Sequence, residues 1–113
     1  LAKFALAQTR FDDGKYDEAA TLYQELIALP DAVVAKETIN FQLAKTYEKQ
    51  SKTKEAADLY FTIAKTAAEA KDSDGKPVPM GETANEAKEK LTALDAERAK
   101  EIVVPTPESP FGN

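Results

Sequence analysis

The sequence predicts an all-α protein built as a stack of antiparallel helical hairpins, and three observations support this fold class. Ala, Glu, Lys, Leu and Arg make up about half of the 113 residues, a composition typical of long helices or coiled coils. The four Gly and six Pro residues fall at a few places, where they separate helical stretches. One segment recurs 37 residues later, so that Tyr60 takes the place of Tyr23. An unbroken coiled coil is excluded, because Gly14 and Pro30 interrupt the heptads.

Five helices are expected between these breaks, over residues 1–13, 16–29, 35–50, 53–70 and 83–101. The connections near Gly14 and Ser51 are short, so the helices on either side of each must be antiparallel neighbours. Pro30 ends the second helix, because proline lacks an amide donor and its ring clashes with the preceding turn. The chain therefore predicts two hairpins followed by a single helix.

The second hairpin is followed by a long loop, over residues 71–81, which holds two Gly and two Pro. Thr83 and Glu86 then match a capping box, in which hydroxyl and carboxylate satisfy free amides at a helix start. The last helix carries one apolar stripe, formed by Ala84, Ala87, Leu91 and Leu94. Beyond it the Pro-rich tail, 102–113, has no periodicity and is expected to be extended or mobile. The predicted boundaries are thus a helical domain over 1–101 and a tail.

Aligning the chain with itself at the spacing of 37 brings identical residues together. The matches are Phe4/Phe41, Leu6/Leu43, Ala7/Ala44, Lys15/Lys52, Glu18/Glu55, Ala19/Ala56, Ala20/Ala57, Leu22/Leu59 and Tyr23/Tyr60. Leu6 and Leu43 are expected on the inner face of the first helix of each unit. On the second helix a small Ala precedes a large Tyr by four residues, which lets two helices interlock. Neither helix of such a unit buries its apolar stripe alone.

These residues resemble the tetratricopeptide repeat (TPR) family, whose period is about 34 residues. The positions that match are Leu6, Ala7, Gly14, Tyr16, Ala19 and Tyr23 in the first unit, and Leu43, Ala44, Tyr47, Ala56 and Tyr60 in the second. Lys3 and Asn40 stand where the family prefers Trp, and three extra residues fall within 30–37. The resemblance implies a right-handed stack with units over about 1–30 and 35–70, closed by the helix 83–101. A narrower similarity is to bacterial envelope proteins tethered by an N-terminal helix.

What the resemblance implies about function is a non-enzymatic scaffold that binds a protein or peptide partner in a concave groove. By position, the groove residues are Phe4, Gln8, Phe11, Phe41, Lys45 and Glu48. The family's best-known groove holds a carboxylate with Lys and Asn, but Phe4 and Gln8 stand at those positions here. Aromatic anchors are therefore expected instead of a carboxylate clamp. Two alternatives stay open: the phenylalanines only pack, and Lys45 with Glu48 forms only a weak surface ion pair.

Several function classes are disfavoured by the composition. The net charge of −5 argues against nucleic acid, because neutralising phosphates needs a basic face. Absence of Cys and His removes the usual nucleophile, general base and metal ligands, so no enzyme and no cofactor are expected. Asp72, Asp74 and Gly75 resemble a calcium loop, but Ala70 and Gly81 stand where its first and last ligands belong. A simple turn is expected there.

The sequence carries a second expectation about assembly. It starts at Leu1 inside a helical pattern, and two units are fewer than the three that stacked repeats usually need. The second expectation is therefore that the chain forms one end of a longer or self-associating solenoid. No apolar run reaches the roughly 18 residues of a membrane span, so direct membrane insertion is not expected. The compartment stays open, since both a bacterial periplasmic protein tethered upstream of Leu1 and a cytoplasmic protein fit.

Overall fold

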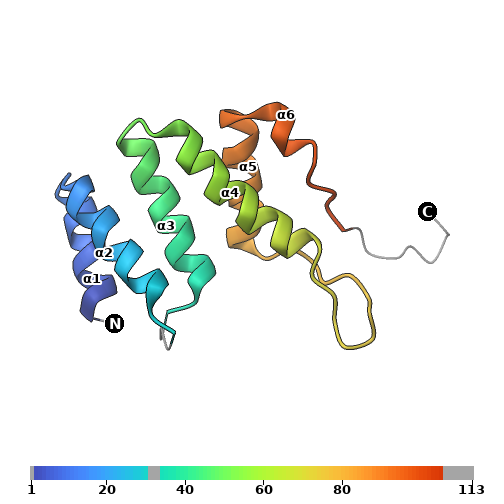
Figure 1. Cartoon of the computed structure of the whole chain (residues 1–113). Coiled ribbons are helices and arrows are strands. Elements are labelled where there is room, and N and C mark those ends of the chain that lie inside the picture. The colour runs from blue at the N-terminus through green and yellow to red at the C-terminus, as the bar shows by residue number, and fades with distance from the viewer. Residues whose placement is uncertain (1, 31–33, 106–113) are drawn as a thin grey trace.

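The computed structural model describes residues 2–30 and 34–105. Its helices are α1 Ala2–Asp12, α2 Tyr16–Ala28, α3 Lys36–Lys49, α4 Thr53–Ala68, α5 Glu82–Leu94 and α6 Ala96–Ala99. Each helix packs against the next along the chain, and α5 also touches α3. Figure 1 shows the hairpins α1–α2 and α3–α4 side by side, with α5 and α6 beyond them. The predicted all-α stack of antiparallel hairpins is confirmed.

The two hairpin turns have the same backbone geometry. The residue before each second helix, Lys15 or Lys52, has φ −90° and ψ 68°, and its backbone N–H donates to a carbonyl of the preceding helix at 2.8 Å. The residues before these lysines both have a left-handed backbone conformation, Gly14 with φ 78° and Ser51 with φ 63°. Ser51 therefore adopts a conformation that glycine reaches at lower cost. The repeat seen in the sequence extends to the main chain.

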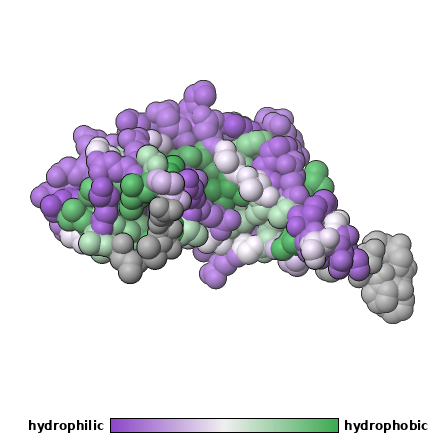
Figure 2. Space-filling model, turned by 60° about the horizontal axis from the view of Figure 1, so that its bottom comes forward, coloured by the Kyte–Doolittle hydropathy of each residue, from purple (hydrophilic) through white to green (hydrophobic). Residues whose placement is uncertain are grey.

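The core consists of two apolar clusters that lie along the stack. One joins α1 and α2 to α3, and the other joins α3 and α4 to α5 and α6; Tyr47 and Leu59 pack against both. The repeated alanines are fully buried, at Ala7, Ala19, Ala44 and Ala56. Figure 2 shows hydrophobic residues gathered near the middle of the drawn face, with hydrophilic residues over much of the remaining surface. Small residues thus let the helices approach closely, as the sequence predicts.

Leu6 departs from its expected place on an inner face. Its side chain is 41% exposed, whereas its counterpart Leu43 is 4% exposed. Leu43 packs in the first cluster, beneath the α1–α2 hairpin. None of the described hairpins lies on the other side of α1–α2, so Leu6 has no equivalent cover.

The predicted helix 83–101 is divided in two at Asp95. This residue has φ −154° and ψ 83°, which is not helical, and its carboxylate accepts the backbone N–H of Arg98 at 3.1 Å. The capping box expected at Thr83 and Glu86 is wrong, because α5 begins after the extended Gly81 with no side-chain cap. Thr83 lies inside the helix, beyond the position at which a hydroxyl caps it.

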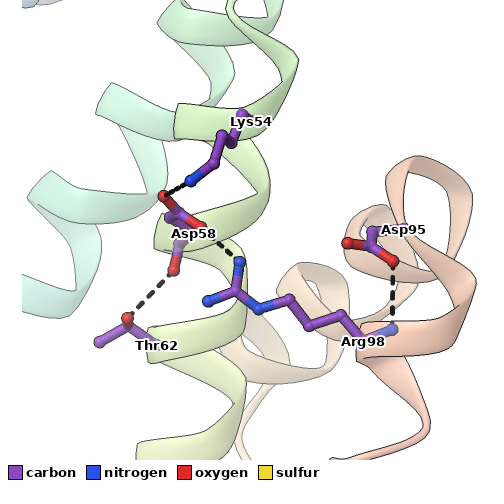
Figure 3. Close-up of polar contacts among 5 residues, drawn as sticks. All are labelled: Lys54, Asp58, Thr62, Asp95 and Arg98. Atoms are coloured by element: carbon purple, nitrogen blue, oxygen red, sulfur yellow. Dashed lines mark hydrogen bonds and ion pairs between the residues drawn. The ribbon is translucent and has the colours of Figure 1, made fainter.

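Arg98 fastens α6 to α4 (Figure 3). Its guanidinium lies 4.4 Å from the centroid of the Phe61 ring and forms an ion pair with Asp58. Lys54 approaches the other oxygen of Asp58 at 3.4 Å. The hydrogen bond from Arg98 is the main cause that holds the pKa of Asp58 below its ordinary 3.8. One carboxylate therefore joins two elements that are distant in sequence.

The chain continues from α6 along the core. Ile102, the first residue of the predicted tail, is 6% exposed and packs in the second cluster. Val103 is 79% exposed, so burial ends there. Residues 106–113 of the predicted tail lie outside the described part of the chain. So do 31–33, which belong to the stretch 30–37 that holds the three extra residues.

Candidate functional site

A groove runs across the first helices of the two hairpins and onto α5. It consists of two adjoining hollows. The first has a volume of about 200 Å³ and is lined by Gln8, Phe11, Asp12, Tyr23, Gln42 and Lys45. The second, of about 270 Å³, is lined by Phe11, Lys45, Glu48, Lys49 and Lys90. Because both hollows share Phe11 and Lys45, we describe them together as the α1–α3–α5 groove.

Four of the six residues predicted from the sequence line this groove, namely Gln8, Phe11, Lys45 and Glu48. The other two, Phe4 and Phe41, support the second helix of their unit. Phe4 meets the Tyr23 ring edge-on at 5.9 Å between centroids, and Phe41 meets Tyr60 at 5.7 Å. Phe41 is only 7% exposed. Both phenylalanines thus make packing contacts within their own hairpin.

Lys45 occupies the boundary between the two hollows. Its ammonium lies 5.7 Å from the centroid of the Phe11 ring and 5.9 Å from that of Phe41, within the range of cation–π attraction. It forms no ion pair within the described residues, so the Lys45–Glu48 pair considered from the sequence is wrong. Glu48 instead lies 3.8 Å from Lys90 and accepts a hydrogen bond from the Tyr60 hydroxyl.

The two units differ at the tyrosine that they share. Burial raises the pKa of Tyr60, and its hydrogen bond to Glu48 raises it further. Burial is also the larger cause for Tyr23, with the charge of Asp12 second, and its pKa rises to about 12. The buried hydroxyl of Tyr23 has no hydrogen-bond partner among the described residues. Phe11 stands in the first unit where Glu48 stands in the second, so Tyr23 lacks the acceptor that Tyr60 has.

Five lining residues were not predicted: Asp12, Tyr23, Gln42, Lys49 and Lys90. Asp12 and Lys49 follow Gln8 and Lys45 by one turn of helix, so helical periodicity places them on the same face. Lys90 carries no such local signal. It reaches the groove because α5 touches α3 after an intervening loop, which is a tertiary feature.

No site for a metal ion was found in the part of the chain that the structure describes. Asp72 is part of a turn, as expected, because its carboxylate accepts the backbone N–H groups of Asp74 and Lys76 at 2.8 and 2.9 Å. None of the helices in the described ranges combines the length and apolar character needed to cross a membrane.

A separate pocket, apart from the groove, lies on the outer side of the first hairpin. It has a volume of about 400 Å³ and is lined by Leu6, Arg10, Asp17, Glu18, Thr21 and Leu22. Leu6 and Leu22 correspond by the repeat to Leu43 and Leu59, which pack beneath the first hairpin. Two of the residues that line this pocket are thus repeat counterparts of residues that pack between the two units.

Comparison with known proteins finds a similarity that falls on the first hairpin. Residues 4–33 match the family model described as tetratricopeptide repeat. This stretch contains nearly all of α1, the turn and α2. No curated protein and no solved structure gave a match. The second hairpin lies outside the matched residues, and its likeness to the first rests on the shared turn geometry and buried alanines.

Proposed function

Because this chain contains a TPR-like domain, of a family that generally mediates protein–protein interaction, we propose that it is a non-enzymatic interaction scaffold. Its units cover about 1–30 and 35–70, and the domain extends to Ile102, which packs in the second cluster. A peptide or a partner helix binds in the α1–α3–α5 groove.

The observation that carries this proposal is the convergence of Gln8, Phe11, Lys45 and Glu48 on two adjoining hollows. Phe11 offers apolar area at low entropic cost, and Gln8 offers an amide to a partner's main chain. Lys45 brings a charge that is half-buried and hence less screened than an open surface charge. Phe4 and Phe41 fix the helices behind these side chains.

A random peptide library, selected on the immobilised full chain, tests the proposal. We expect selected peptides to lose most of their affinity for Gln8→Ala/Lys45→Ala, measured by fluorescence anisotropy. The control Thr92→Ala/Lys36→Ala removes one neutral polar side chain and one lysine at exposed sites outside the groove and the outer pocket. Its circular dichroism melt and its affinity should match the wild type. Equal affinity for both double variants, or no selected peptide, contradicts groove binding.

The exposure of Leu6 favours a second candidate function. In this alternative, the outer side of α1–α2 stacks on another TPR-like unit or a second copy, and the domain is one end of a solenoid in a membrane-tethered envelope protein. Leu6 and Leu22 then take the place that Leu43 and Leu59 have between the two units. Sedimentation over a wide concentration range, with Leu6→Glu as the variant, tests self-association. A wild type that stays monomeric throughout rules out the second copy as occupant.

A further inference from the structure

We propose that the partner of the α1–α3–α5 groove is an acidic segment in extended conformation, with its side-chain carboxylates held by Lys45, Lys49 and Lys90. This inference rests on the proposed function and adds the chemistry of the partner. The charges of the second hollow and the polar groups of the first support it.

The second hollow concentrates positive charge in a protein whose net charge is −5. Three of its lining residues are lysines, and Glu48 is its one acid. The Glu48 carboxylate is already engaged, since it accepts a hydrogen bond from the Tyr60 hydroxyl and lies 3.8 Å from Lys90. Lys45 and Lys49 form no ion pair within the described residues, so both ammonium groups are open to a carboxylate.

Of the three lysines, Lys45 is the one best placed to distinguish a partner that carries a carboxylate from one that does not. Its side chain is half-buried and its ammonium rests against the Phe11 and Phe41 rings. The rings restrict the conformations of this lysine, so less side-chain entropy is lost when a carboxylate binds. A partner side chain that reaches Lys45 also contacts Phe11, which lines both hollows.

The first hollow suits the main chain of the same segment. The Tyr23 hydroxyl is buried without a partner and, with a pKa raised to about 12, it stays a hydrogen-bond donor at neutral pH. Gln8 and Gln42 add amide groups, and Asp12 adds an acceptor for a backbone N–H. A partner helix satisfies its own backbone groups, whereas an extended segment leaves them free to pair. The polar lining therefore favours an extended partner.

The other anionic partners fit less well. A nucleic acid or an anionic membrane presents many phosphates, which need a basic face. Here Asp12 and Glu48 lie among the lysines, and the whole chain is acidic. A short segment with one or two carboxylates meets the lysines without extending over the acidic surroundings.

The test compares two sets of short synthetic peptides on the full chain by fluorescence anisotropy. One set carries a pair of Glu residues at varied spacing around a Leu, and the other has Gln in place of each Glu. We expect the wild type to bind the best Glu peptides roughly tenfold more tightly than their Gln forms, as two partly exposed charge pairs provide. Rising salt should reduce this ratio.

Lys45→Gln/Lys49→Gln should abolish the preference, while Lys36→Gln/Lys76→Gln, with the same change in net charge at exposed sites, should keep it. Tyr23→Phe should weaken the binding of both peptide sets alike.

If Glu and Gln peptides bind equally and both are lost in Gln8→Ala/Lys45→Ala, the groove binds peptides but the acidic partner is wrong. No binding of any peptide contradicts the proposed function as well. Binding of phosphatidylserine vesicles or single-stranded DNA that depends on Lys45 and Lys49, without a peptide preference, overturns the inference in favour of a phosphate partner.

Discussion

At the scale of single residues, the same amino acid plays two parts in the two units. Tyr60 donates its hydroxyl hydrogen to Glu48, whereas the hydroxyl of Tyr23 is buried without an acceptor. A hydrogen bond to a charged group contributes about 1.5–3 kcal/mol, and an unpaired buried hydroxyl contributes a cost. The repeat thus conserves the ring and changes what surrounds its polar end.

This difference predicts opposite effects of one substitution. Tyr60→Phe should lower the free energy of unfolding by about 1–2 kcal/mol, because Glu48 loses its donor. Tyr23→Phe should leave the free energy unchanged or raise it slightly. Urea denaturation followed by circular dichroism measures both. An equal loss in the two variants would show that Tyr23 has an acceptor in solution.

The left-handed residues of the two turns predict a second matched pair. Ser51 has φ 63° and Gly14 has φ 78°, and a Cβ added at Gly14 meets no atom within 4 Å. The cost at both positions is therefore one of backbone conformation, about 1 kcal/mol. Ser51→Gly should raise the melting temperature and Gly14→Ser should lower it, as calorimetry would measure. A shift in the same direction for both variants contradicts this account.

The residues that sequence reasoning located correctly are those with a repeating pattern. Ala7, Ala19 and their counterparts follow the spacing of 37 and are buried as expected. Leu6 follows the same pattern but is exposed, because its burial depends on a neighbouring hairpin and not on its own helix. Sequence periodicity identifies a face of a helix, whereas the presence of something to cover that face is a property of the assembly.

At the scale of elements, α6 depends on side-chain contacts more than on length. It has four residues, too few to be stable alone. Arg98 holds it by stacking on Phe61 and pairing with Asp58, and Ile102 packs just beyond it. The break at Asp95 lets the chain turn so that Arg98 reaches α4. The sequence predicted one helix here, since Asp95 interrupts the helix without a Gly, a Pro or a counterpart in the repeat to mark the break.

Removing this contact should affect stability in a pH-dependent way. The pKa of Asp58 is lowered in the folded state, so its contribution is present above pH 3.8 and is lost as the pH falls below that value. Asp58 is partly exposed, so Asp58→Asn should cost below about 1 kcal/mol at neutral pH. The difference from wild type should vanish at lower pH.

Arg98→Ala provides the control for this pH effect, because it also removes the ring contact. It should be destabilised at every pH by about 1 kcal/mol, with a further part that disappears in acid. Urea melts at a series of pH values measure both variants. A constant difference for Asp58→Asn across this range would exclude the ion pair as its cause.

At the scale of the whole molecule, the local free energy of unfolding should differ from one hairpin to the next along the stack. The hairpin α3–α4 is covered on one side by α1–α2 and on the other by α5, while α1–α2 packs on one neighbour within the described residues. Stability in such arrays is a sum of unit and neighbour contributions. The first hairpin should therefore open more readily than the centre.

Leu43→Ala tests this, because Leu43 is buried between the two hairpins. The loss of a buried leucine costs about 2–5 kcal/mol, and hydrogen exchange should accelerate most in α1 and α2. The control Leu6→Ala removes the exposed counterpart and should change exchange little. Uniform acceleration through α4 and α5 would mean that the molecule unfolds as one unit.

The groove also shows where prediction from sequence ends. The resemblance placed Gln8, Phe11, Lys45 and Glu48 on one side of α1 and α3, and all four line the two hollows. Lys90 was not, because its approach depends on how the loop 71–81 returns α5 towards α3. The engagement of Glu48 by Tyr60 also came only from the packing of α3 against α4. Repeats thus predict the helical faces of a groove, and tertiary contacts decide which charges on them are free.

The position of Phe11, under Lys45 and common to both hollows, has a practical consequence. The chain contains no Trp, so a single indole introduced by Phe11→Trp would be the sole source of tryptophan emission. Its spectrum would report the polarity of the groove directly, and a bound segment that displaces water would shift it to shorter wavelength. The fluorescence of this variant would therefore report occupancy of the groove without a label on the partner.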